Sequence, residues 1–362
     1  MEEGPLSKSR FEALTYKYPR FYPQKVKDFT LDDNLPLAGL TIRNEYRSKA
    51  AKFGLGTLDV LPLELLQESL SHLDVSTLTK FRHINRRAAD VVESIPEFKA
   101  IVMHAPNALL GILSVETGHL ISCKALYEQL CTAECEHCGS FAGYLYVLTC
   151  SRVCFHCFTA KERYLPLRYC DARRKFGIDR KILKTLPSMR SIPGKYSREQ
   201  LNRPKRLVLV DSGSAYRAGV ALHGSPGAMR RYASHVYAQE LQEHNIKAFH
   251  ASANGTYLPR HLYPHDAVEG NPLRFMGIIR MPWLNRATRE PEYGAYCIGC
   301  ISCHDNCLLN QFDIQTLSHH ANPVMSLRRI YQRLHRRLYT EASFSEHLRQ
   351  YGDIRDRKHI GT

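Results

Sequence analysis

The sequence predicts an α+β fold that consists of an N-terminal helical part, a β-hairpin and a mixed C-terminal region. Two observations lead to this prediction. Leucines recur at helical spacing between Leu58 and Pro96. A segment with the composition of a β-strand, residues 144–148, lies between two pairs of closely spaced cysteines. Residues 1–55 contain several prolines and many basic residues, and we expect them to form a flexible N-terminal segment.

Residues 56–100 have the pattern of three short amphipathic helices. Pro62 suits the first turn of a helix, because its missing N–H would have no partner there. Asp74 or Ser76 can cap a second helix, and Asn85 can cap a third. The apolar positions that define the first two helices are Leu61, Leu65, Leu66, Leu70, Leu73, Leu78, Phe81 and Ile84.

These three helices with their Leu61-Pro62 start resemble an F-box, although Ser69 stands where that family often has an aliphatic residue. The resemblance implies that the chain binds a Skp-type adaptor, and through it the cullin of an SCF-type ubiquitin ligase. The residues that it assigns to partner binding are Leu61, Pro62, Glu64, Leu65, Leu66, Leu73, Leu78, Phe81 and Ile84. An ordinary amphipathic helical hairpin is the alternative interpretation. Residues 101–130 continue the helical pattern and are expected to form a connector.

The strongest chemical signal is a pair of Cys-x-x-Cys turns within residues 131–165. Cys135 and Cys138 are separated by fifteen residues from Cys154 and Cys157, which is a spacing typical of zinc sites. Four thiolates leave no open coordination position, so the sequence predicts a structural zinc in a β-hairpin rather than a catalytic zinc. Buried free cysteines are the alternative. Cys131 and Cys150 are spare thiols with no assigned role.

The combination of an F-box with this cysteine segment resembles a group of zinc-containing F-box proteins of filamentous fungi. The matching residues are Cys135, Glu136, Cys138, Gly139, Arg152, Val153, Cys154, Cys157 and Phe158. The resemblance implies a non-catalytic substrate receptor, in which residues 166–362 would recruit a protein substrate that it does not name. No cysteine has the context of a transfer nucleophile. No WD, leucine-rich or kelch repeat indicates how a substrate would be held.

A second cysteine cluster lies near the C-terminus, at Cys297, Cys300, Cys303 and Cys307. Zinc is the favoured ligand, held either within the cluster or shared with Cys131 and Cys150. The spacing also matches a bacterial iron–sulfur run, but Leu308 stands where that run has proline. An iron–sulfur redox protein is therefore a minor alternative, and free thiols are another.

Two further segments of the C-terminal region have recognisable patterns. Residues 207–210 are a candidate buried strand, and Asp211 follows them directly, so a structural role for its carboxylate is the default. Leu327, Ile330, Leu334 and Leu338 recur at helical spacing among several arginines. We expect a packed helix with a solvated basic face, and an anionic partner surface is the alternative.

The composition limits the function classes. The formal net charge is +15, and two four-thiolate zinc sites would lower it to +11. A basic surface is favoured over nucleic-acid binding, because no DNA- or RNA-reading motif is present. A zinc-dependent nucleic-acid or chromatin-binding protein remains the main alternative. No apolar run reaches the length of a membrane span, and the N-terminus lacks a secretory pattern, so we expect a soluble protein in the cytoplasm, the nucleus or both.

Overall fold

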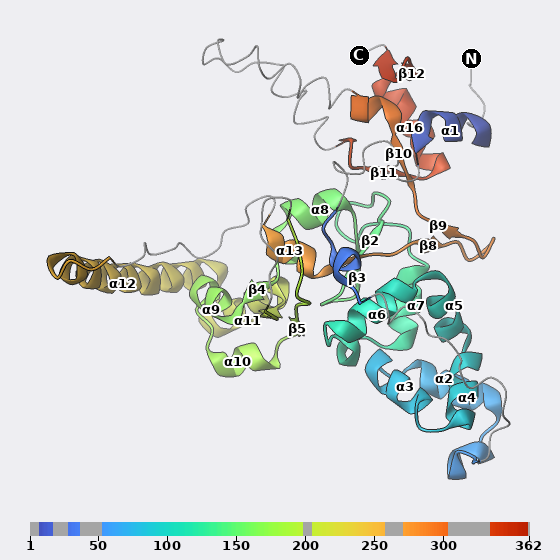
Figure 1. Cartoon of the computed structure of the whole chain (residues 1–362), viewed down its shortest axis with the longest axis horizontal. Helices are drawn as coiled ribbons and strands as arrows, with labels where there is room; N and C mark the ends of the chain where they lie inside the picture. Colours follow the sequence, from blue (N-terminus) through green and yellow to red (C-terminus); the bar gives the residue numbers. More distant parts are fainter. Residues whose placement is uncertain are drawn as a thin grey trace.

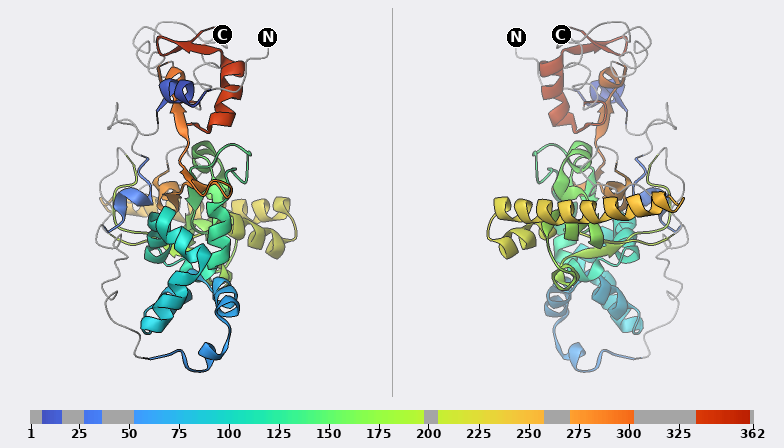
Figure 2. Two further views of the ribbon diagram at one scale, coloured as in Figure 1. Left: turned by 90° about the vertical axis from the view of Figure 1, so that its right-hand side faces the viewer. Right: turned by 90° about the vertical axis from the view of Figure 1, so that its left-hand side faces the viewer.

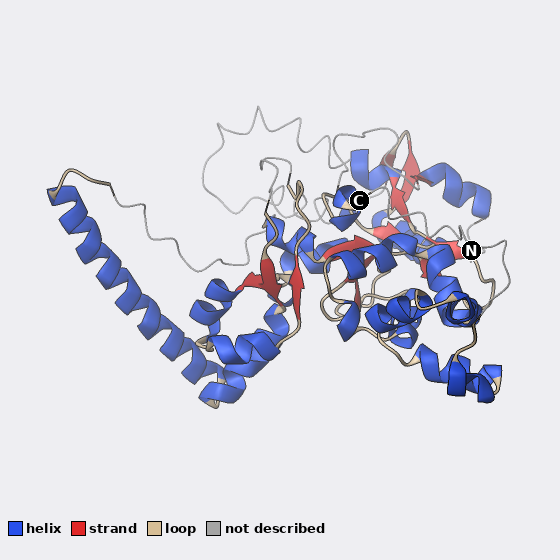
Figure 3. Ribbon diagram, turned by 60° about the horizontal axis from the view of Figure 1, so that its bottom comes forward, coloured by secondary structure: helices blue, strands red, loops and turns tan. Residues whose placement is uncertain are grey.

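The computed structural model describes residues 7–16, 28–36, 53–197, 205–257, 271–302 and 334–360. Helices dominate these ranges, and short strands between them form small sheets in which every pairing is antiparallel (Figure 1, Figure 3). This mixture of helices and small antiparallel sheets is compatible with the predicted α+β class. No helix in the described ranges combines the length and the apolar character that a membrane crossing requires.

The predicted helical region forms α2 (Leu63–Ser71), α3 (Val75–Arg82) and α4 (Arg86–Ser94), with a single-turn helix η3 (Gly56–Val60) before them. Two of the predicted caps are confirmed. The Asp74 carboxylate accepts a hydrogen bond from the backbone N–H of Thr77 at 2.8 Å. Asn85 Oδ1 accepts one from the N–H of Ala88, also at 2.8 Å.

The expected connector also forms helices, which are α5 (Pro96–His104), α6 (Pro106–Ser114) and α7 (Cys123–Leu130). Two backbone hydrogen bonds fasten the start of α7 to the turn between α2 and α3. Val75 N–H donates to Ile121 at 2.8 Å, and Cys123 N–H donates to Leu73 at 3.0 Å. Buried side chains of α2 and of the connector belong to one hydrophobic core, so the three-helix part is not a separate unit.

The predicted hairpin consists of β2 (Tyr144–Tyr146) and β3 (Ser151–Val153), and it is not free-standing. The other edge of β2 pairs with β7 (Ile278–Arg280), so that Leu145 lies opposite Ile279. All three residues of β2 are buried. The hairpin therefore shares the main core and has more apolar support than the sequence indicates.

A second sheet, of order β4-β6-β5, lies beside this core. Its strands are β4 (Leu167–Arg168), β5 (Ser188–Arg190) and β6 (Val208–Val210). The helices around it are α9 (Tyr169–Phe176), α10 (Arg180–Thr185) and α11 (Ser212–His223). The structural role predicted for Asp211 is confirmed. Its carboxylate caps α11 by accepting from Ser214 N–H at 2.7 Å, and it accepts from the Tyr146 hydroxyl at 3.0 Å.

Four shorter elements and one long helix complete the body. The shorter ones are α8 (Phe155–Ala160), α13 (Pro272–Met276), β8 (Trp283–Leu284) and β9 (Pro291–Glu292). The long helix α12 (Pro226–Ala253) begins against α9 and α11 and then projects away from the body (Figure 1). Met229 near its start is buried, whereas Ile246 and Phe249 in its outer half are exposed.

Both ends of the chain meet in a small unit that we call the terminal module, made of residues 7–16, 295–302 and 334–360 (Figure 2). Its elements are α1 (Lys8–Leu14), β1 (Thr15–Tyr16), β10 (Ala295–Cys297), β11 (Leu338–Tyr339), α16 (Glu341–Tyr351), β12 (Asp353–Arg355) and β13 (Lys358–Ile360). Strand β10 pairs with β1 on one side and with β11 on the other.

The described parts of the N-terminal segment differ from the flexible segment expected there. Phe11 on α1 packs against Phe344 on α16, and Tyr16 stacks on Tyr296 with ring centroids 5.3 Å apart. Leu31, in the short helix η1 (Leu31–Asn34), is fully buried in the main core. These aromatic and leucine side chains find apolar partners from distant parts of the sequence, which local proline content does not reveal.

A buried ion network joins the N-terminal segment, the central sheet and the terminal module. The Asp28 carboxylate is 1% exposed and lies 3.0 Å from Arg280 Nη2 and 2.6 Å from Arg336 Nη1. The Tyr144 hydroxyl donates to the same carboxylate at 2.6 Å. The Arg336 guanidinium also lies over the Phe155 ring, 4.6 Å from its centroid.

The sequence predicts a packed helix with a solvated basic face over residues 327–338. The described part of this segment, residues 334–338, differs from that prediction. Arg336 is 15% exposed and faces the buried Asp28 instead of solvent. Leu338 belongs to strand β11, where pairing with β10 replaces helical structure. Leu327 and Ile330 lie outside the described residues.

We predict that Asp28→Asn destabilises the protein by about 3 kcal/mol, because Arg280 and Arg336 then lose a buried counter-charge. Asp353→Asn is the matched control. Asp353 pairs with Arg10 at 2.8 Å, but both side chains are more than 40% exposed, so its loss should cost less than about 1 kcal/mol. Free energies of unfolding from urea titrations test this difference, and equal losses in the two variants would contradict it.

Candidate functional site

The start of α2 lies at the end of the molecule opposite the terminal module (Figure 2), and exposed apolar residues gather in the sequence around it. Leu61, Leu63 and Leu65 are 42%, 41% and 57% exposed, and Val60 beside them is 84% exposed. Ile84, in the turn before α4, is 67% exposed. Pro62 and Glu64 are exposed as well. We call Val60, Leu61, Leu63, Leu65 and Ile84 the apolar tip.

The remaining residues predicted to bind a partner lie elsewhere. Leu66 and Leu78 are 2% and 0% exposed in the main core, so they stabilise the helices and are not accessible to a partner. Leu73 and Phe81 are partly buried and pack against the same core. The leucine stripe thus divides into one row that folds the three helices and another row that faces solvent.

Polar contacts hold the turn that precedes the apolar tip. The Asp59 carboxylate accepts hydrogen bonds from Leu55 N–H and from Arg87 Nε, and these contacts lower the pKa of Asp59. Asn85 Nδ2 donates to the Gly54 carbonyl at 3.1 Å. The Arg87–Asp59 and Asn85–Gly54 contacts tie this turn to the start of α4. They thereby restrict the backbone that carries Val60 and Leu61.

The hairpin brings the four predicted cysteines together. Strands β2 and β3 are antiparallel, so the turn before β2 and the residues after β3 lie at the same end of the hairpin. Cys135 and Cys138 occupy that turn, and Gly139 leaves it with φ of +70°. Cys154 caps α8, where its sulfur accepts from Cys157 N–H at 3.4 Å.

The sulfur geometry fits one tetrahedral ion. The four Sγ atoms lie within 4.8 Å of one another, and those of Cys138 and Cys154 are 3.6 Å apart. Zn–S bonds of about 2.3 Å place the sulfurs of a tetrahedral site about 3.8 Å apart. Neither His137 nor His156 belongs to this group of ligand atoms. The four cysteines therefore form a candidate metal site, as their spacing predicts.

Thiols packed this closely oppose one another's ionisation. Hydrogen bonds with Cys154 and Cys157 lower the pKa of Cys135 well below the usual thiol value. The interaction with Cys135 in turn raises the pKa of Cys154 to about 12. A bound divalent cation removes this conflict, because it stabilises the thiolate form of every ligand.

A buried arginine, Arg152, lies next to the candidate metal site and holds the hairpin that carries it. Arg152 is 1% exposed, and its guanidinium donates to the carbonyls of Met281 and Pro282 at 2.8 and 3.1 Å and to that of Ala142. Burial lowers the pKa of Arg152 to about 9. These bonds join β3 to the segment after β7, so the Cys154 end of the hairpin is anchored on both sides.

Among the described residues, the second cluster brings two of the predicted cysteines together with two histidines that the sequence does not indicate. Cys297 and Cys300 lie with His347 of α16 and His359 of β13, and all four ligand atoms are within 4.8 Å of one another. Cys303 and Cys307 lie outside the described residues. The two histidines follow Cys300 by 47 and 59 residues. Neither histidine stands at a ligand spacing from the cysteines in the sequence. The folding of α16 and of the β12-β13 hairpin brings them to the cysteines.

The spare thiols take part in neither group. Within the described ranges, Cys131 and Cys150 are absent from both sets of ligand atoms, so the proposed sharing with the second cluster is not found. The Cys131 carbonyl accepts from Trp283 Nε1 at 3.1 Å. Burial raises the pKa of the Cys150 thiol to about 12.

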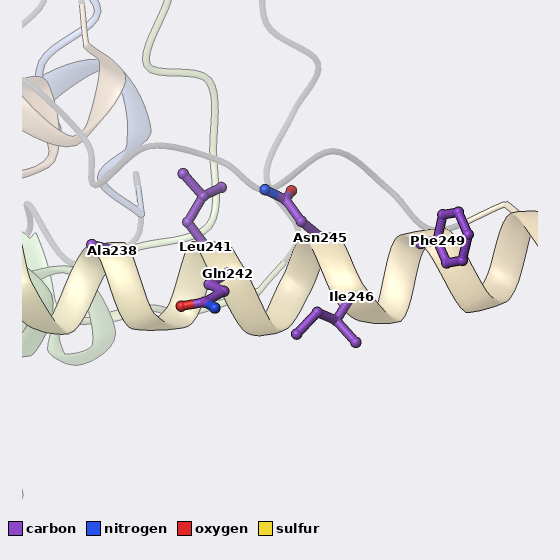
Figure 4. Close-up of a pocket in the computed structure, with 6 residues that line it drawn as sticks. All are labelled: Ala238, Leu241, Gln242, Asn245, Ile246 and Phe249. Atoms are coloured by element: carbon purple, nitrogen blue, oxygen red, sulfur yellow. The ribbon is translucent and has the colours of Figure 1, made fainter.

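The outer half of α12 carries a shallow hollow whose described lining residues all belong to this helix (Figure 4). Ile246 and Phe249 contribute exposed apolar side chains, and Gln242 and Asn245 contribute amides. Residues on a single helix cannot enclose a small ligand, whereas they can contact a protein surface.

Comparison of the chain with models of protein families, with curated proteins and with solved structures found no match. The geometry of the apolar tip and of the two cysteine-containing groups is therefore what indicates a function.

We predict that Cys154→Ser removes about one metal ion per chain, because a hydroxyl is a much poorer soft ligand than a thiolate. Elemental analysis of the purified protein measures the loss. Cys170→Ser is the control, since Cys170 is an exposed thiol outside both groups. Hydrogen exchange should rise at residues 135–140 and 154–160, while β2 stays protected by its pairing on both edges. Equal metal content in the two variants would refute the assignment.

Proposed function

We propose that this protein is an F-box-type subunit of an SCF-type ubiquitin ligase, in which the apolar tip binds a Skp-type adaptor and the rest of the chain recruits a substrate. The observation that carries the proposal is the solvent exposure of Leu61, just before α2, and of Leu63 and Leu65 in its first turn, while Leu66 and Leu70 of the same helix are buried. Large apolar side chains gathered in one exposed patch are typical of protein interaction sites.

The form of the apolar tip suits insertion into a hydrophobic groove. Hydrophobic grooves accept apolar side chains that a helix presents, and here Leu65 lies in the first turn of α2 while Leu61 precedes that helix in extended backbone. The contacts of Asp59 and Asn85 pre-order the turn, so that binding loses less conformational entropy. Ile84, in the α3–α4 turn, adds a further exposed apolar side chain in the same three-helix part.

Zinc is the ion that we propose for Cys135, Cys138, Cys154 and Cys157. Four thiolates favour a borderline-soft cation, and they fill a tetrahedral shell so that no position is left for a substrate. The ion would hold the turn before β2 against the start of α8. Its role would be structural, and ubiquitin transfer would be carried out by other subunits of the ligase in the cytoplasm or the nucleus.

The projecting helix α12 is our candidate surface for substrate recruitment. It belongs to the region after residue 166, it extends away from the apolar tip, and Ile246 and Phe249 are 52% and 74% exposed on it (Figure 1). A protein substrate bound there would not cover the adaptor-binding end.

Three of the described basic residues are engaged in ion pairs within the chain. Arg336 contacts the buried Asp28, Arg174 lies 2.9 Å from Glu240, and Lys175 lies 3.0 Å from Glu162. Cations paired in this way within the chain are not free to form a phosphate-binding stripe.

The adaptor proposal predicts that Leu61→Ala combined with Leu65→Ala weakens adaptor binding by about 2–4 kcal/mol, or at least about thirtyfold, because both anchors are truncated. Binding of the purified Skp-type adaptor can be measured by calorimetry. Leu222→Ala on α11 is the matched control, since Leu222 is an equally apolar side chain that is 52% exposed. Unchanged affinity in the double variant, with the fold intact, would argue against the F-box assignment.

The recruitment proposal predicts a reciprocal pattern in affinity purification followed by mass spectrometry. Ile246→Ala combined with Phe249→Ala should lose substrate candidates and keep the adaptor, because α12 lies away from the apolar tip. The Leu61 and Leu65 double variant should lose the adaptor and keep those candidates. If the α12 variant retains every partner of the wild-type chain, the helix is not the recruitment surface.

A further inference from the structure

We propose that Cys297, Cys300, His347 and His359 bind one zinc ion, and that this ion fastens the two ends of the chain into the terminal module. The inference goes beyond the ligase function and does not rest on it. Its ligand set also differs from the four-cysteine set that the sequence spacing indicates.

The distances fit a mixed sulfur and nitrogen shell around a single ion. Cys300 Sγ lies 3.4 Å from His347 Nε2 and 3.5 Å from His359 Nε2, and Cys297 Sγ lies 3.4 Å from His359 Nε2. Zn–S bonds of about 2.3 Å and Zn–N bonds of about 2.0–2.1 Å place sulfur and nitrogen about 3.6 Å apart in a tetrahedron. Ligand atoms this close surround one ion, whereas a cluster of several irons would spread them more widely.

The two cysteines repeat the local geometry of the first candidate metal site. Cys297 Sγ accepts the backbone N–H of Cys300 at 3.4 Å, and Cys154 Sγ accepts that of Cys157 at the same distance. In both places the first cysteine ends an extended segment, and the second lies in the helical turn that follows. The sequence thus builds the same metal-binding turn twice, once with cysteine partners and once with histidine partners.

The histidines are oriented for coordination through Nε2. His359 Nδ1 donates to the Gly352 carbonyl at 2.9 Å, which leaves the lone pair of Nε2 directed at the sulfurs. Gly299 makes room for this ring, because a Cβ at that position would lie 2.9 Å from His359 Nε2. The His347 ring packs on Tyr339 with centroids 4.5 Å apart, which fixes its plane.

The charge of the proposed site matches its burial. Cys297 and Cys300 are fully buried and His347 is 3% exposed, so a site with a large net charge would be strongly disfavoured there. Two thiolates, two neutral imidazoles and one divalent cation sum to zero. The first site can carry four thiolates because Cys138 is exposed to solvent. Binding at the second site releases the two thiol protons to water.

The ion would compensate for a small core. Among the described residues, the hydrophobic cluster of the terminal module contains eight buried residues, and Phe11, Leu334 and Phe344 are among them. Units of this size often need a metal or another cross-link to remain folded. Strand β10 carries Cys297 and pairs with β1, so an ion held between β10, α16 and β13 also orders the N-terminal segment.

Zinc content of the full-length protein tests the ligand set. Wild type should contain two zinc ions per chain, one for each group. His347→Ala combined with His359→Ala should lose one of them, whereas Cys303→Ala combined with Cys307→Ala should keep both. His235→Ala combined with His250→Ala, two exposed histidines of α12, is the control for histidine loss. Retention of both ions in the His347 and His359 variant would overturn the proposal, and so would loss of one ion in the Cys303 and Cys307 variant.

X-ray absorption at the zinc edge of the wild-type protein tests the ligand set even if the His347 and His359 double variant does not fold. The proposal expects zinc–nitrogen distances of about 2.0–2.1 Å in addition to zinc–sulfur distances of about 2.3 Å. A shell of sulfur only, or iron in place of the second zinc, would overturn it. His359→Cys supplies a thiolate and should restore the second ion. Limited proteolysis of the soluble His359→Ala variant should then cleave within residues 7–16, and protection equal to wild type would show that the ion does not order this segment.

Discussion

Strand β2 is the element on which the rest of the structure depends, because its edges and its side chains reach four separate parts of the chain. Its backbone pairs with β3 on one edge and with β7 on the other. The Tyr144 hydroxyl donates to Asp28, which also holds Arg280 and Arg336, and the Tyr146 hydroxyl donates to Asp211 at the start of α11. Both tyrosines are fully buried, so each needs this hydrogen-bond acceptor. Three strand residues thereby fix the N-terminal segment, the terminal module and the second sheet.

Local sequence patterns predict the features that depend on neighbouring residues. The caps at Asp74 and Asn85, the hairpin around Tyr144 and the four-cysteine group all follow from spacings of a few residues, or of one hairpin length. Periodicity also finds the leucines of α2, but it cannot divide them between core and surface. That division depends on where α4 and α7 pack, which places Leu66 inside and leaves Leu65 outside.

The features that the sequence could not predict arise from contacts between distant segments. Strand β7 reaches β2 from more than 130 positions later in the chain. His347 and His359 join Cys300 because α16 and β13 fold back over β10, and no ligand spacing marks either residue. Arg336 looks like part of a solvated basic face until Asp28, about 300 residues earlier, is seen to neutralise it. In each case tertiary packing decides the role of a residue whose neighbours in sequence suggest another one.

The pairing of β1 with β10 places a constraint on how this protein is made in the cell. Thr15 lies opposite Cys297, so a strand that leaves the ribosome early waits for a partner about 280 residues behind it. At synthesis rates of about 5–20 residues per second, the delay is on the order of 15–60 s. The helices from α2 to α7 leave the ribosome long before this, whereas Phe11 and Tyr16 stay exposed on the nascent chain. Pairing of β1 with β10 is therefore a late step in the folding of the chain, because it cannot precede the synthesis of Cys297.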